Sequence, residues 1–167
     1  GLRPELRATM ALPMFWGKLV FAAAMAGVGL VLLCRLARPG MPIGYAPLLL
    51  AAVPPAVLWT LAWIALSQAP AAERVPLILG STWRQCPFNI AALSVPAFVA
   101  GFWALRGAAP TRLAWAGAGA GLLAGALGAL VYALHCPEMA APFLAVWYMV
   151  GIAIPAAVGA ALGPRLL

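Results

Sequence analysis

Five long apolar runs constrain this chain more than any other feature. They contain no Asp or Glu and cover residues 15–37, 46–66, 88–105, 113–134 and 142–162. Each has the roughly 20 residues that an α-helix needs to cross the ~30 Å hydrocarbon core of a bilayer. We therefore predict an all-α fold, a polytopic transmembrane helical bundle with five spans, in which residues 1–167 form a single integral membrane domain.

The composition supports a membrane protein and argues against several other classes. Hydrophobic residues make up 66% of the chain and charged residues 8%, and the mean hydropathy is +1.04. A net charge of +7 could suggest nucleic-acid binding, but the basic residues are scattered over the connections, as is usual beside membrane spans. The chain has no Asp, which rules out a Ser-His-Asp triad. We expect neither an enzyme nor direct contact with nucleic acid.

The basic residues give a weak indication of orientation. Five lie on each predicted face, so their number alone does not decide which face is cytoplasmic. The short connections weigh more than the long one, and they favour a cytoplasmic location for the face that carries Arg35, Arg38, Arg106, Arg112 and Arg165. This orientation puts the other face in the periplasm, if the protein lies in a bacterial inner membrane.

Cys86 and Cys136 are predicted to lie on the same side of the membrane. Cys86 follows the second run and Cys136 follows the fourth, so two spans separate them, whereas Cys34 lies at the opposite side. Each of the pair precedes a proline, and a residue before proline disfavours helical geometry. Both should therefore stand at helix boundaries. A helix N-terminus and the nearby Arg84 would favour the thiolate form of Cys86.

Three interpretations of this cysteine pair remain open: a structural disulfide, a thiol switch for oxidants or soft metals, and two unrelated buried thiols. We favour the switch, because the predicted periplasmic side is oxidising. His135 adjoins Cys136, so Cys86, Cys136 and His135 could bind a thiophilic metal ion transiently, with Glu138 or Met139 nearby. No CxxC motif strengthens the metal interpretation, and we expect no other cofactor.

Small residues recur at four-residue spacing in the last two runs. Gly117, Gly121 and Gly125 form one stripe, and Gly151 and Gly159 belong to a second. Such stripes let helix backbones approach closely in lipid. They could form a dimer interface, but packing within one bundle is the favoured interpretation.

The chain resembles the NrsF-type proteins, negative regulators of the extracytoplasmic-function sigma factor called sigma F. The resemblance covers nearly the whole chain and is most specific from Cys86 onward. It is carried by Cys86-Pro87, Ser94-Val95-Pro96, Leu105-Arg106, Ala109-Pro110, Gly117 to Gly128, Tyr132-Ala133-Leu134-His135-Cys136, Trp147-Tyr148 and Gly163-Pro164-Arg165.

This resemblance implies a membrane-bound anti-sigma factor with six spans in its full length. Such a protein would hold its sigma factor at the inner membrane through cytoplasmic parts and release it under oxidant or heavy-metal stress. Cys86 and Cys136 would correspond to the family's sensing cysteines. The family's N-terminal tail and first span are not expected within these residues, so the sigma-binding segment would lie upstream of Gly1. The alternatives are a small permease or metal-ion transporter and a structural subunit of a membrane complex.

Overall fold

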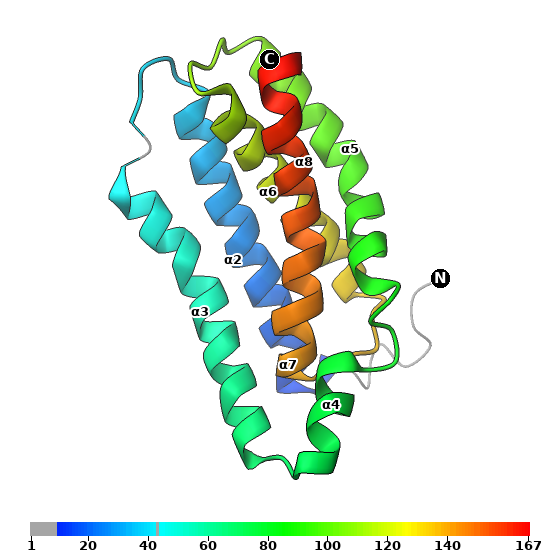
Figure 1. Ribbon diagram of the computed structural model, residues 1–167. Helices are drawn as coiled ribbons and strands as arrows, with labels where there is room; N and C mark the ends of the chain where they lie inside the picture. Colours follow the sequence, from blue (N-terminus) through cyan, green and yellow to red (C-terminus); the bar gives the residue numbers. More distant parts are fainter. Residues whose placement is uncertain (1–9, 43) are drawn as a thin grey trace.

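The computed structural model describes residues 10–42 and 44–167, and within these ranges the chain forms helices joined by turns, without strands. This agrees with the predicted all-α fold (Figure 1). The helices are α2 (Pro13–Leu36), α3 (Tyr45–Gln68), α4 (Ala71–Leu79), α5 (Cys86–Arg106), α6 (Leu113–Ala133), α7 (Ala141–Phe143), the π-helical segment η1 (Leu144–Tyr148) and α8 (Met149–Leu166).

The five predicted spans are confirmed, with shifted boundaries. Five helices of the described residues are long and apolar enough to cross a membrane. The last span runs without a break through α7, η1 and α8, from Ala141 to Leu166, four residues past the predicted end. The helix continues through Gly163 and Pro164, although glycine and proline commonly mark helix ends, and Pro164 supplies no N–H to the last turn. The long connection between the second and third spans contains α4, a short amphipathic helix.

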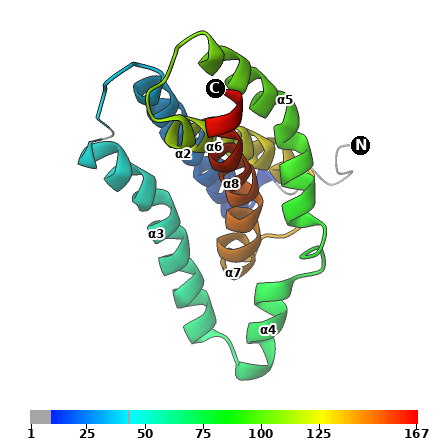
Figure 2. The ribbon, with the colours of Figure 1, turned by 45° about the horizontal axis from the view of Figure 1, so that its top comes forward.

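Helix α6 lies at the centre of the bundle. It packs against α8, α2 and α5, and the turned view shows these three helices around it (Figure 2). Helix α3 instead leans away from this group and meets it mainly at α7 and along part of α2 (Figures 1 and 2). The molecule therefore has a closely packed part, made of α2, α5, α6 and α8, and an arm made of α3 and α4.

The predicted glycine stripes lie at helix contacts within the chain. A Cβ atom on Gly125 would come 2.7 Å from the carbonyl oxygen of Ile152, and one on Gly121 would meet the backbone of Pro155 still more closely. Gly117 and Gly159 face one another in the same contact between α6 and α8. Gly151 differs, because it faces the side chain of Ile90 on α5. The stripe on the last span thus serves two neighbours, which its spacing alone does not reveal.

Candidate functional site

Both cysteines of the predicted pair stand at helix boundaries at the same end of the bundle. Cys86 is the first residue of α5, and its N–H donates to the carbonyl of Thr82. Helix α6 ends at Ala133, and the N–H of Cys136 still donates to the carbonyl of Tyr132 at 2.8 Å. The following prolines disfavour helical geometry at each cysteine. Local sequence chemistry therefore places one thiol at the start of α5 and the other just beyond the end of α6.

The structure brings these two thiols together. Neither Cys86 nor Cys136 has any exposed surface, and the thiol of Cys86 is hydrogen-bonded to the sulfur of Cys136. Both are thiols, not halves of a disulfide. Cys34 lies near the far end of α2 and is exposed. The pair thus joins the start of one span to the end of the next inside the protein.

The surroundings of Cys136 favour its charged form. The hydrogen bond from the Cys86 thiol lowers the pKa of Cys136 to about 6, against the opposing effect of burial. The backbone N–H of Glu138, the hydroxyl of Tyr148 and the ammonium of Lys18 lower it further. Hydrogen bonds to a thiolate and a nearby positive charge stabilise the anion. Of the two sulfurs, Cys136 is therefore the one that ionises more readily.

The cation at this site is Lys18, not Arg84 as the sequence suggested. Lys18 belongs to α2 and has no exposed surface, and its Nζ donates to the carbonyl oxygen of Cys136 at 2.8 Å. The exposed guanidinium of Arg84 lies 5.0 Å from the ring centroid of Trp83. Sequence reasoning passed over Lys18 because it lies near a span end. Its signal was a lone Lys inside an otherwise uncharged apolar stretch.

Glu138 connects the cysteine pair to the arm. Its Oε1 accepts hydrogen bonds from the backbone N–H of Ser81 at 2.8 Å and from the Ser81 hydroxyl at 2.6 Å. A second connection runs from Trp147, whose Nε1 donates to the carbonyl of Ile78 at 2.9 Å. The turn that follows α4 is therefore held against the residues that flank Cys136.

Tyr148 lies at the end of the π-helical segment and closes the site from the last span. Its side chain is fully buried beside Cys136. No acceptor in the described part of the chain meets its hydroxyl with full hydrogen-bond geometry. π-helical turns occur often at functional sites. Here the segment brings a buried hydroxyl toward a sulfur that carries charge.

His135 differs from the two thiols in its exposure to the surroundings of the protein. Its side chain is exposed, whereas that of the next residue, Cys136, is buried. The imidazole lies near the ring of Tyr132, with 6.5 Å between centroids, and lines a hollow together with Asn89. Within residues 10–42 and 44–167, no group of three or more His, Cys, Asp or Glu side chains is arranged to hold a metal ion. The ligand set of Cys86, Cys136 and His135 is thus not assembled here.

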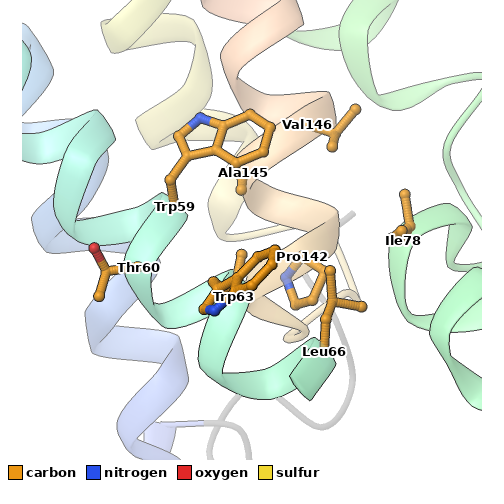
Figure 3. Close-up of a pocket in the computed structure, with 9 residues that line it drawn as sticks. Trp59, Thr60, Trp63, Leu66, Ile78, Pro142, Ala145 and Val146 are labelled. Carbon is orange, nitrogen blue, oxygen red and sulfur yellow. The ribbon is translucent and has the colours of Figure 1, made fainter. Parts of the chain in front are cut away.

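An apolar groove lies between the arm and the last span, away from the thiols. It encloses about 540 Å³, and Trp59 and Trp63 of α3 face Pro142 and Ala145 across it (Figure 3). Thr60 also lines the groove, but its hydroxyl donates a hydrogen bond to the carbonyl oxygen of Ala56 at 2.8 Å. The groove offers apolar contact and no reactive group. The chemistry of this protein is therefore expected at the cysteine pair.

Comparison with known proteins identifies the family. Residues 1–167 match the family described as "Negative regulator of sigma F". The chain belongs to the NrsF family. It is 45% identical over 166 residues to the "Probable anti-sigma-F factor NrsF" of Azospira oryzae, covering 99% of this chain and 78% of the relative. It is 35% identical over 165 residues to the "Anti-sigma-F factor NrsF" of Caulobacter vibrioides, covering 99% and 77%. No solved structure matches the chain.

Membership confirms the resemblance noted from the residues and sets the broad role. NrsF proteins are regulators rather than enzymes, in agreement with the expectation from sequence. The five apolar helices fit a protein embedded in a membrane. The site described above thus belongs to a regulatory membrane protein.

Proposed function

We propose that this chain is the membrane part of an anti-sigma factor that holds an extracytoplasmic-function sigma factor inactive and releases it when Cys86 and Cys136 are oxidised. The observation that carries the proposal is that both thiols are buried in one cluster, where the Cys86 thiol is hydrogen-bonded to Cys136. The family and the names of its relatives support the sigma-factor partner.

The oxidation step follows from the different roles of the two sulfurs. The Cys136 thiolate attacks one oxygen of a peroxide, the O–O bond breaks, and a sulfenic acid forms as hydroxide leaves. The Cys86 sulfur then attacks the oxidised sulfur and displaces a second hydroxide, which gives the disulfide. Overall, two thiols and hydrogen peroxide become one disulfide and two water molecules. The thiols lose two electrons, and the peroxide gains them.

A thiophilic cation is a second trigger that the same pair could accept. Two adjacent sulfurs can bind a soft divalent ion in a two-coordinate arrangement, and both thiol protons leave when it binds. Either event replaces the hydrogen bond between Cys86 and Cys136 by a link of different geometry. The link would join the start of α5 to the end of α6.

The orientation proposed from the arginine-rich short connections puts the cysteine pair in the periplasm of a bacterium and the opposite end of the bundle in the cytoplasm. The inner membrane would then separate the stimulus from the sigma factor.

A reporter gene driven by the sigma factor tests this function in cells that produce the full-length protein. Cys86→Ser and Cys136→Ser should each keep the reporter low and lose at least nine-tenths of its induction by peroxide. Cys34→Ser, at the other end of the bundle, is the matched control and should respond normally. Normal induction in both single variants of the pair would refute oxidation of Cys86 and Cys136 as the trigger.

A further inference from the structure

Lys18 is a charged residue whose side chain is enclosed by the bundle, although it lies close to the end of a span. It is the sixth residue of α2, and its side chain has no exposed surface. A lysine in the first turns of a span usually extends toward the membrane surface, because an ammonium in the apolar region costs about 2.5–3.5 kcal/mol at the bilayer centre. Inward orientation therefore indicates a specific interaction inside the protein.

The inward side chain contacts the cysteine site. Its Nζ donates to the carbonyl oxygen of Cys136, 118 residues away in sequence, and lies 5.6 Å from the ring centroid of Phe15. The same ammonium acts electrostatically on the sulfurs of both Cys86 and Cys136. One side chain of α2 thus interacts with the backbone and with the charge of the thiol pair.

The hydrogen bond explains how the turn after α6 is held. Cys136 lies beyond Ala133, the last residue of α6, so its carbonyl is not part of the hydrogen-bond ladder of that helix. Lys18 supplies a donor to the carbonyl of Cys136 from a different helix. The orientation of the Cys136 backbone, and with it the position of the sulfur, therefore depends on α2.

Helix α2 continues from this site to the other end of the bundle. It packs along α6, and a Cβ atom on Gly29 would come 2.7 Å from the backbone nitrogen of Leu123. Farther along, Leu36 is buried in a second apolar cluster with Phe102 and Leu105 of α5. Close contacts of α2 therefore run from the region of Lys18 to the end of the bundle that carries Arg35.

We propose that Lys18 is the positioning residue of the thiol pair and the link through which α2 reports the state of the pair to the opposite end of the bundle. The part about positioning rests on the geometry alone, and the part about reporting rests on the proposed function. Formation of a disulfide by the peroxide reaction above removes the negative charge from Cys136. The buried ammonium then loses a stabilising interaction, and the position of α2 that enclosed it is disfavoured.

The reduction potential of the pair tests the positioning role. The full chain in lipid nanodiscs, with Cys34→Ser as background, is equilibrated with glutathione buffers, and the disulfide fraction is measured. Lys18→Met should shift the equilibrium about tenfold toward the disulfide, which corresponds to about 30 mV, because the reduced form loses its cation. Lys18→Arg should stay within about threefold of the parent, because a cationic donor is kept.

Arg84→Met is the matched control for this measurement. It removes a positive charge two residues from Cys86 that lies over Trp83 instead of donating to Cys136. An unchanged potential in Lys18→Met, or an equal shift in Arg84→Met, would overturn the positioning role. If Lys18→Met does not fold, Lys18→Gln, which keeps a donor but no charge, should shift the equilibrium in the same direction, and no shift would again overturn the proposal.

The reporter assay tests the second role and separates it from the proposed function. Lys18→Met should leave the reporter insensitive to peroxide even though alkylation assays show that Cys86 and Cys136 still form a disulfide in those cells. A normal response in Lys18→Met, together with a lost response in Cys86→Ser and Cys136→Ser, would reject α2 as the link while the proposed function stands. A normal response in both cysteine variants would reject the proposed function and the reporting role, and the reduction potentials would still decide the positioning role.

Discussion

Helices α6 and α3 look alike in hydropathy and differ completely in their surroundings. The most apolar stretch of α3 has a mean hydropathy of 2.0 and is 11% buried, whereas that of α6 has a mean hydropathy of 1.6 and is 56% buried. The more hydrophobic helix is therefore the less buried one. In a bilayer, lipid chains are as apolar as leucine, so helices associate through close packing of small residues. The glycines of α6 explain its central place, and the absence of glycine from α3 fits the position of that helix in the arm.

The largest effect is expected from filling the contact between α6 and α8. Gly121→Leu would put a side chain into the backbone of Pro155. We expect a loss of about 3 kcal/mol or more in the free energy of unfolding, the upper range for an overpacked interior. Equilibrium unfolding in mixed micelles with increasing dodecyl sulfate measures this change.

Two controls sharpen the comparison between α6 and α3. Gly27→Leu, on a face of α2 where a Cβ atom would meet nothing within 4 Å, should change the free energy of unfolding by less than about 0.5 kcal/mol. Ala52→Leu, on the exposed surface of α3, should do the same. If Ala52→Leu is as damaging as Gly121→Leu, α3 is packed against another chain or segment and the contrast fails.

The next largest effect concerns the junction between the arm and the packed part. Glu138→Ala removes the acceptor of the Ser81 N–H and hydroxyl. Hydrogen bonds to a charged group contribute about 1.5–3 kcal/mol, and exposure at Ser81 reduces this to about 1–2 kcal/mol. Hydrogen exchange of the amides after α4 should therefore accelerate about tenfold.

Glu73→Ala is the matched control for the junction, because Glu73 is an exposed acid on α4 itself. It should leave the exchange of the Ser81 amide unchanged. Equal acceleration in both variants would mean that the loss of any negative charge near α4 loosens the arm, and that the hydrogen bonds to Glu138 are not the cause.

The contrast between α6 and α3 also shows which features could be predicted from the sequence. The spans were predictable because length and hydropathy suffice to identify them, and the shared side of Cys86 and Cys136 followed from counting spans. Their contact was not predictable, since it depends on how α5 packs against α6. The inward turn of Lys18 was missed for the same reason: its position near a span end is equally compatible with an outward side chain. The arm was missed because hydropathy does not distinguish lipid from protein as a neighbour.

A pH profile tests the charge on Cys136, at the junction of the two regions. With its pKa lowered to about 6, mainly by the hydrogen bond from Cys86, Cys136 is largely thiolate at pH 7. In a Cys34→Ser background, its alkylation by a small neutral reagent should be nearly constant above pH 7 and fall about tenfold per pH unit below 6, since only the thiolate reacts. Glu138, Lys18 and Tyr148 also act on this sulfur.

Cys86→Ala supplies the control for this profile. It removes the side chain that donates a hydrogen bond to Cys136, so the midpoint should move to higher pH. Mass spectrometry of the labelled peptides assigns the reaction to Cys136. A midpoint near the ordinary thiol value of 9 in the parent chain would contradict the assignment of the charge to Cys136.

The smallest effect is expected on the open side of α3. Trp63 is 74% exposed and lines the apolar groove, whereas Phe143 at the start of the last span is fully buried. Trp63→Leu should change the free energy of unfolding by less than about 0.5 kcal/mol, since lipid replaces the lost contacts, and Phe143→Leu should cost about 1–2 kcal/mol by leaving a cavity. Brominated lipids should quench the fluorescence that Trp63→Leu removes. A cost above 1 kcal/mol for Trp63→Leu, without such quenching, would mean that protein rather than lipid covers α3.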